Sequence, residues 1–142
     1  MTKQEAQKRA EEIREIVLRE DDLGFHALMA LATRYRIIFT LGNYGVRFSE
    51  QHGHWILGVP EESYETGEQV FLLATGIAQV ILETPDKELT ETFARAILIP
   101  GEQLREALTN GVPVDTLSRK YDVPVFVVFQ RMNEVRSIHK AI

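Results

Sequence analysis

One uninterrupted apolar run constrains the fold of this chain more than any other feature. Residues 70–82 read VFLLATGIAQVIL and contain no charged side chain. A run of this length is too short to span a bilayer, which takes about 20 residues. Its length and flanks favour a buried helix over a strand, although Gly76 lowers the helix propensity. The sequence therefore predicts a helix buried in the core of a globular domain.

The segments before this run predict two helices and three strands. The spacing of apolar residues indicates an amphipathic helix over 2–20. Asp21 and Asp22 are expected to cap a second helix. The apolar face of that helix is expected to consist of Phe25, Leu28, Met29, Leu31 and Ala32. β-branched and aromatic residues predict strands, separated by turns, over 36–40, 46–49 and 54–59.

Four more helices are expected after the apolar run, and a polar loop before it at 60–67. The expected helices cover 87–99, 101–109, 114–121 and 125–139. This order predicts a single α+β domain over 1–142 that is mostly helical. It has a small antiparallel sheet of about three strands and a C-terminal pair of helices similar to a helix-turn-helix.

Composition and charge argue against several classes of protein. The 142 residues suffice for one domain with a core of its own. Sixteen Lys and Arg against 21 Asp and Glu give a net charge of −5, which disfavours binding through nucleic-acid phosphates. The absence of cysteine excludes disulfides, thiolate metal sites and a cysteine nucleophile. The charged first residues lack the apolar core of a signal peptide, so a cytoplasmic location is expected.

Two motifs in the second half of the chain carry a family resemblance. Residues 88–100, ELTETFARAILIP, are similar to the pattern E-x-x-A-N-x-F-A-x-x-L-L-x-P, with matches at Phe93, Ala94, Leu98 and Pro100. Residues 114–135 follow LA-x-x-F-x-V-S-x-x-x-V-x-x-R-L, in register at Leu117, Tyr121, Val123, Arg131 and Met132. With the helix–strand–strand order through Trp55, Ile56 and Leu57, these motifs resemble the ImmA/IrrE zinc metallopeptidases from about residue 28 to 132.

This resemblance implies a zincin-like layout. Residues 1–100 would form the peptidase-like part, and residues 101–142 the C-terminal helical part. Glu88 is assigned to the place of the family's third zinc ligand.

The other zinc-binding positions of that family are replaced in this chain. The family helix reads F-T-L-A-H-E-x-x-H, where two His one turn apart bind zinc and the Glu acts as general base. Thr75, Gly76 and Gln79 stand at those three positions, and none is a usual zinc ligand or base. No catalytic residue and no cofactor are therefore expected. With Glu88 these residues would line a relic cleft; alternatively, Thr75 and Gln79 pair with each other inside a helical core.

A different zinc site stays open as an alternative. His52 and His54 alternate along a predicted strand and so share one face. With Glu88 they would supply the ligands of an active metallopeptidase. The competing interpretation is a hairpin turn with two exposed imidazoles.

The C-terminal helix pair leaves a DNA-binding alternative. The basic side chains that would serve it are Arg119, Lys120, Arg131 and Arg136. However, residues 125–129 read VFVVF, where a recognition helix presents polar groups to base edges. Such an apolar segment fits better with packing on the domain or on another protein.

These observations favour binding over hydrolysis. We expect a non-catalytic relative of the ImmA/IrrE peptidases that binds and regulates another protein. The resemblance implies a repressor, of a phage or another mobile element, or a component of the transcription machinery. Nucleic acid and membrane are not expected as partners, and the oligomeric state is left open.

Overall fold

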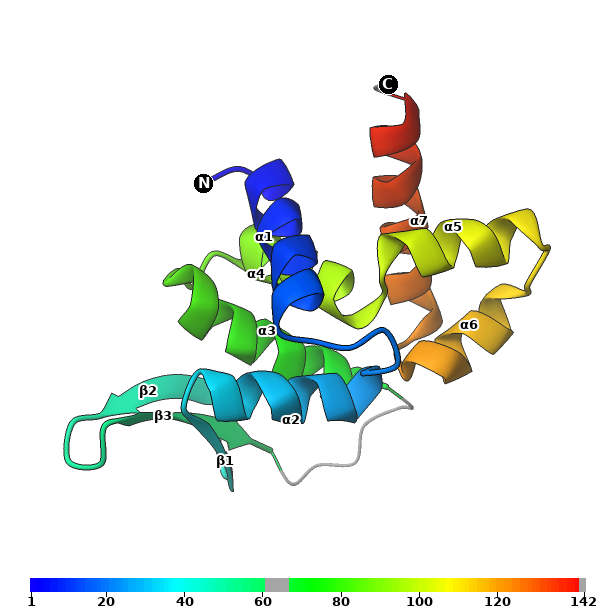
Figure 1. The fold of residues 1–142 in the computed structure, drawn as a ribbon. Coiled ribbons are helices and arrows are strands. Elements are labelled where there is room, and N and C mark those ends of the chain that lie inside the picture. Colours follow the sequence, from blue (N-terminus) through cyan, green and yellow to red (C-terminus); the bar gives the residue numbers. More distant parts are fainter. Residues whose placement is uncertain (61–66, 141–142) are drawn as a thin grey trace.

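The chain folds into helices packed on one side of a small sheet (Figure 1). The computed structural model describes residues 1–60 and 67–140, with side chains up to Arg136. The elements in these ranges are α1 (Lys3–Ile16), α2 (Gly24–Arg34), β1 (Ile37–Leu41), β2 (Gly45–Ser49), β3 (His54–Val59), α3 (Glu68–Leu82), α4 (Lys87–Leu98), α5 (Gly101–Thr109), α6 (Val114–Tyr121) and α7 (Val125–Lys140). The expectation of an α+β, mostly helical fold is confirmed. The polar loop expected at 60–67 lies mostly outside the described residues.

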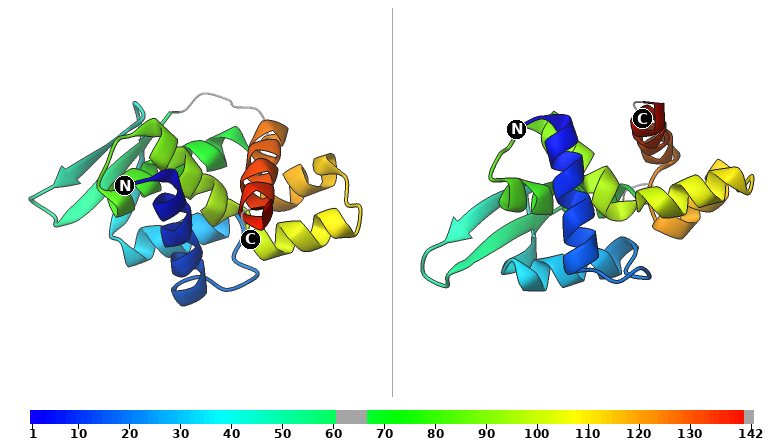
Figure 2. Two further views of the ribbon diagram at one scale, coloured as in Figure 1. Left: turned by 90° about the horizontal axis from the view of Figure 1, so that it is seen from above. Right: turned by 45° about the horizontal axis from the view of Figure 1, so that its top comes forward.

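The helices form two groups, one next to the sheet and one away from it. Helices α2 and α3 lie against one face of the sheet, and α4 packs between α3 and α1. Helices α5, α6 and α7 are grouped at the end of the molecule away from the sheet (Figure 2). No helix within the described ranges is long and apolar enough to cross a membrane.

The sheet is mixed, which corrects the expectation of an antiparallel sheet. Its order is β1-β3-β2, with β2 antiparallel and β1 parallel to the central β3. The segment that joins β1 to β2 therefore has to cross the end of β3. It crosses at Gly58, where an added Cβ would lie 2.0 Å from the carbonyl oxygen of Asn43. Strand order depends on this long-range contact, so local sequence patterns did not indicate it.

Helix α3 forms the centre of the core, as the apolar run predicts. Six of its apolar side chains are buried: Val70, Leu73, Ala74, Ile77, Ala78 and Val80. It contacts α2, α4, β2 and β3. A helix surrounded on several sides has to be apolar on several faces, which explains the uninterrupted run.

Two helix ends in the first half differ from expectation. Helix α1 begins with a capping box between Thr2 and Glu5 but ends at Ile16 instead of near residue 20. The chain after it is held by Arg14, whose Nη2 donates to the carbonyl of Asp22 at 2.9 Å. The side chain of Asp22 accepts a hydrogen bond from the Arg19 amide at 2.8 Å and does not cap α2. The predicted Asp21–Asp22 cap is therefore wrong.

The C-terminal helix pair forms as expected. Helices α6 and α7 are joined by Asp122, in the left-handed conformation, followed by Val123 and Pro124. Tyr121 and Val123 are fully buried and fix this turn on the core.

Candidate functional site

The hydroxyl of Thr75 is fully engaged inside the fold. Its Oγ1 donates to the carbonyl of Leu72 at 2.7 Å and lies 2.8 Å from the hydroxyl of Tyr44, which also reaches that carbonyl at 3.1 Å. Burial raises the pKa of Tyr44, and the hydrogen bond to Thr75 lowers it in part. The alternative to the relic cleft was a hydrogen bond between Thr75 and Gln79. The structure corrects this, because the side-chain partner of Thr75 is Tyr44. Tyr44 was missed because only the tertiary fold brings the turn before β2 onto α3.

The position of Gly76 is filled by a side chain from the sheet. A Cβ at Gly76 would lie 2.5 Å from Cδ1 and 2.8 Å from Cδ2 of Leu57, which is fully buried on β3. Gly76 therefore lets α3 and β3 approach closely. A glutamate base at this position has no room, and the relic cleft expected around Thr75 and Gly76 is closed by packing.

Glu88 points to the surface and pairs with another helix. Its side chain is 75% exposed, and Oε1 lies 3.6 Å from Nζ of Lys3 on α1. A pair this exposed contributes little to stability. Counted back from Phe93, the glutamate of the family motif falls on Lys87, so the assignment of Glu88 as a relic ligand is weak on sequence as well.

The alternative zinc ligands are not brought together. His52 is exposed in the turn between β2 and β3, and the half-buried His54 begins β3; their rings stack with 5.5 Å between the centroids. Within residues 1–60 and 67–136, no three His, Cys, Asp or Glu side chains gather closely enough to hold a metal ion. The set His52, His54 and Glu88 is therefore not formed.

The basic cluster expected to serve DNA is split. Arg119 and Lys120 on α6 and Arg136 on α7 are exposed. Arg131 is 0% exposed, and its Nε donates to the carbonyl of Ile99 at 2.9 Å. A buried guanidinium does not reach phosphates or bases, so including Arg131 in a nucleic-acid surface was wrong.

Helix α7 exposes apolar side chains where a recognition helix would carry polar groups. Val125, Phe126 and Phe129 are exposed, and the ring of Phe126 meets that of Phe71 edge to face at 6.4 Å. These apolar side chains do not offer the polar groups that read base edges.

A second apolar surface follows strand β1 and the neighbouring helix α2. The exposed members of this β1–α2 surface are Phe25, Met29 and Leu41, while the exposed Ile38 points to the opposite face of the sheet. Phe25 contacts the half-buried Phe39 with 6.3 Å between ring centroids. Phe25 and Met29 were expected in the core, but Ala27, Leu28 and Leu31 fill the buried face of α2. The sequence contained the signal, because α2 carries apolar residues on two faces.

Comparison of the chain with protein-family models, with curated proteins and with solved structures gives no match. The resemblance to the ImmA/IrrE family therefore stays a prediction.

Proposed function

We propose that this chain is a non-catalytic protein-binding module that holds an extended segment of another protein against the edge of its sheet. The observation that carries the proposal is the apolar edge strand β1, where Leu41 is 70% exposed on the face that packs on α2 and Ile38 is exposed on the opposite face. Phe25 and Met29 on α2 extend the surface on the side of Phe39 and Leu41. The family resemblance suggests a transcription regulator as partner, such as a repressor of a mobile element.

The main-chain groups of β1 support this mode of binding. The carbonyl of Arg36 accepts from the Trp55 amide, and the Gly42 amide donates to the Val59 carbonyl. Because bonding directions alternate along a strand, Ile37, Phe39 and Leu41 direct their main-chain groups away from β3. In the described part of the chain β3 is the only strand that pairs with β1. An incoming strand would gain affinity from these groups and specificity from the apolar side chains.

Hydrolysis is not part of the proposal because of the residues that occupy the expected zinc site. Thr75 is satisfied by Tyr44 and Leu72, and Leu57 fills the space beside Gly76. The proposal also places the protein in the cytoplasm, in agreement with the absence of cysteine.

The proposal is tested by mapping the contact face of a partner captured from the native host. In hydrogen-exchange measurements on the purified complex, we expect new protection at the amides of Ile37, Phe39 and Leu41. Leu41→Pro removes one outward N–H at a strand edge that tolerates proline, and should weaken binding about tenfold. Leu41→Ala keeps the amide and should weaken binding less.

The matched control lies on the other apolar surface. Phe129→Ser on α7 should leave binding unchanged, with circular dichroism confirming that all variants are folded. Loss of binding in Phe129→Ser together with full binding in Leu41→Pro would show that α7 is the docking face and that the proposal is wrong.

A further inference from the structure

A charged side chain lies in the interior with part of its hydrogen-bonding capacity unused. Arg131 is fully buried, and only its Nε has a hydrogen-bond acceptor, the carbonyl of Ile99. Among the described residues, Nη1 and Nη2 have no hydrogen-bond partner. Buried hydrogen-bond donors are normally satisfied, so Nη1 and Nη2 have unused capacity for an acceptor.

The acidic neighbours of Arg131 do not supply that acceptor. Glu134 on the same helix accepts two hydrogen bonds from Arg95, at 3.0 Å and 3.1 Å. Glu11 on α1 forms an ion pair with Arg131, with 3.8 Å between Oε1 and Nη2, a distance too long for a hydrogen bond; the same oxygen accepts from Gln7 at 3.2 Å. Burial lowers the pKa of Arg131; Glu134 and Glu11 raise it, and Arg105 and Arg95 lower it further. The guanidinium nevertheless stays protonated at neutral pH.

Arg105 and the first amides of α5 add further hydrogen-bond donors near Arg131 and Gly101. An ideal Cβ at Gly101 would lie 3.2 Å from Nη2 of Arg131 and 4.0 Å from Nη2 of Arg105. The Nε of Arg105 is also buried without a hydrogen-bond partner among the described residues. Gly101 begins the nine-residue helix α5, whose first turn has no side-chain cap. Its free amides and positive dipole end favour an anion at this place.

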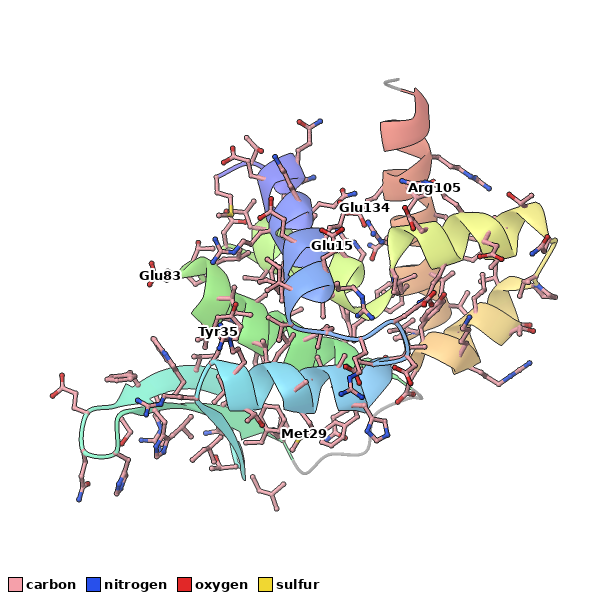
Figure 3. The ribbon with its side chains drawn as sticks, viewed as in Figure 1. Glu15, Met29, Tyr35, Glu83, Arg105 and Glu134 are labelled. Carbon is pink, nitrogen blue, oxygen red and sulfur yellow. The ribbon has the colours of Figure 1, made fainter. Side chains whose placement is uncertain are left out.

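A cleft of about 880 Å³ leads to this point between α1 and α5. Figure 3 shows Glu15 and Arg105 on its two walls. Glu11, whose side chain is 47% exposed, lines the cleft and stands in front of Arg131. The acidic side chains that line the cleft are Glu11, Glu12, Glu15, Glu20, Glu102 and Glu106. The basic ones are Lys8, Arg14, Arg19 and Arg105.

We propose that this cleft binds a small zwitterion, such as a free amino acid. Its carboxylate would take the place of the Glu11 carboxylate beside Arg131, near Arg105 and the first amides of α5, after the side chain of Glu11 swings aside. Its ammonium group would face the glutamates of the rim. The excess of acidic side chains on the rim opposes a doubly charged anion such as phosphate.

The test is an NMR titration of the full chain with glycine, acetate and inorganic phosphate at constant ionic strength. We expect saturable shifts of the Gly101, Glu102 and Gln103 amides and of the Arg131 Nε–H signal. Glycine should bind more tightly than acetate, and phosphate most weakly. Absence of saturable shifts with glycine and acetate would mean that water alone satisfies Arg131, and tighter binding of phosphate or acetate than of glycine would overturn the assignment to a zwitterion.

Two substitutions change the site without removing the buried arginine. Gly101→Ala places a methyl 3.2 Å from Nη2 of Arg131, against the donor that the carboxylate would use. It should weaken glycine binding about tenfold, the loss of one charge-assisted hydrogen bond. Gly45→Ala, where an added Cβ meets nothing within 4 Å, is the matched control and should not change the affinity. Glu11→Gln removes the competing carboxylate and should tighten binding. Equal affinity in all three variants and the wild type would contradict the proposal.

Discussion

Gly76 is the residue at which the packing of this domain excludes a side chain. A glycine in the middle of a helix is unfavourable by about 1 kcal/mol relative to alanine. Here it allows the methyl groups of Leu57 to occupy the space of its missing Cβ. Gly76 therefore lowers the helix propensity of α3 but allows close contact with the sheet.

We predict that Gly76→Ala destabilises the protein by about 1–2 kcal/mol. The added methyl would lie 2.5 Å from Leu57 Cδ1, and the strain of overpacking exceeds the gain in helix propensity. Urea unfolding measures the change.

In the control, the expected change in the free energy of unfolding has the opposite sign. In a Leu57→Ala background the clash is gone, so Gly76→Ala should raise the free energy of unfolding by about 1 kcal/mol. The same sign in both backgrounds would show that Leu57 does not limit the space at Gly76.

Helix α7 buries one apolar face and exposes another. Val127, Val128, Met132 and Val135 are buried, while Val125, Phe126 and Phe129 are exposed. The apolar start of α7 therefore exceeds what the core of this domain covers.

We predict a large and a small loss of stability for the same substitution at two positions three residues apart on α7. Val128→Ala should lower the free energy of unfolding by roughly 2 kcal/mol, because it removes two buried carbon atoms and leaves a cavity. Val125→Ala, on the exposed face, should change it by less than about 0.5 kcal/mol. Equal losses measured by urea unfolding would contradict the assignment of the two faces.

The ends of elements were predictable where a local signal marks them. The bounds of β3, α5 and α6 coincide with those expected, at positions flanked by Pro, Gly or Asn. The end of α1 was not predictable, because Arg14 holds the following turn through carbonyls up to Asp22 and through that of Ile97 on α4. The strand order likewise depends on the crossing at Gly58.

For the whole molecule, we predict that stability falls as the pH rises above about 10. Burial raises the pKa of Tyr44 and of Tyr121, opposed in part by the Thr75 hydrogen bond and by Arg14 respectively. Both phenols therefore lose their protons more readily in the unfolded chain, whose tyrosines titrate near pH 10. Their contribution is complete below that pH and is lost as the pH rises through the folded-state pKa values.

Urea unfolding across this pH range checks the prediction against a Tyr44→Phe/Tyr121→Phe variant. The variant should lose less stability per pH unit than the wild type, since phenylalanine does not titrate. Identical slopes would show that neither tyrosine contributes.

The sequence by itself determined the helical and strand segments and the buried run of α3, because periodicity and residue identity are local properties. Only the tertiary structure decided which groups meet: Tyr44 with Thr75, Leu57 with Gly76, and Arg131 with the start of α5. It also separated His52 and His54 from Glu88 and buried Arg131. Contacts between distant segments depend on strand order and helix packing, and the spacing of residues in one segment carries no information about them.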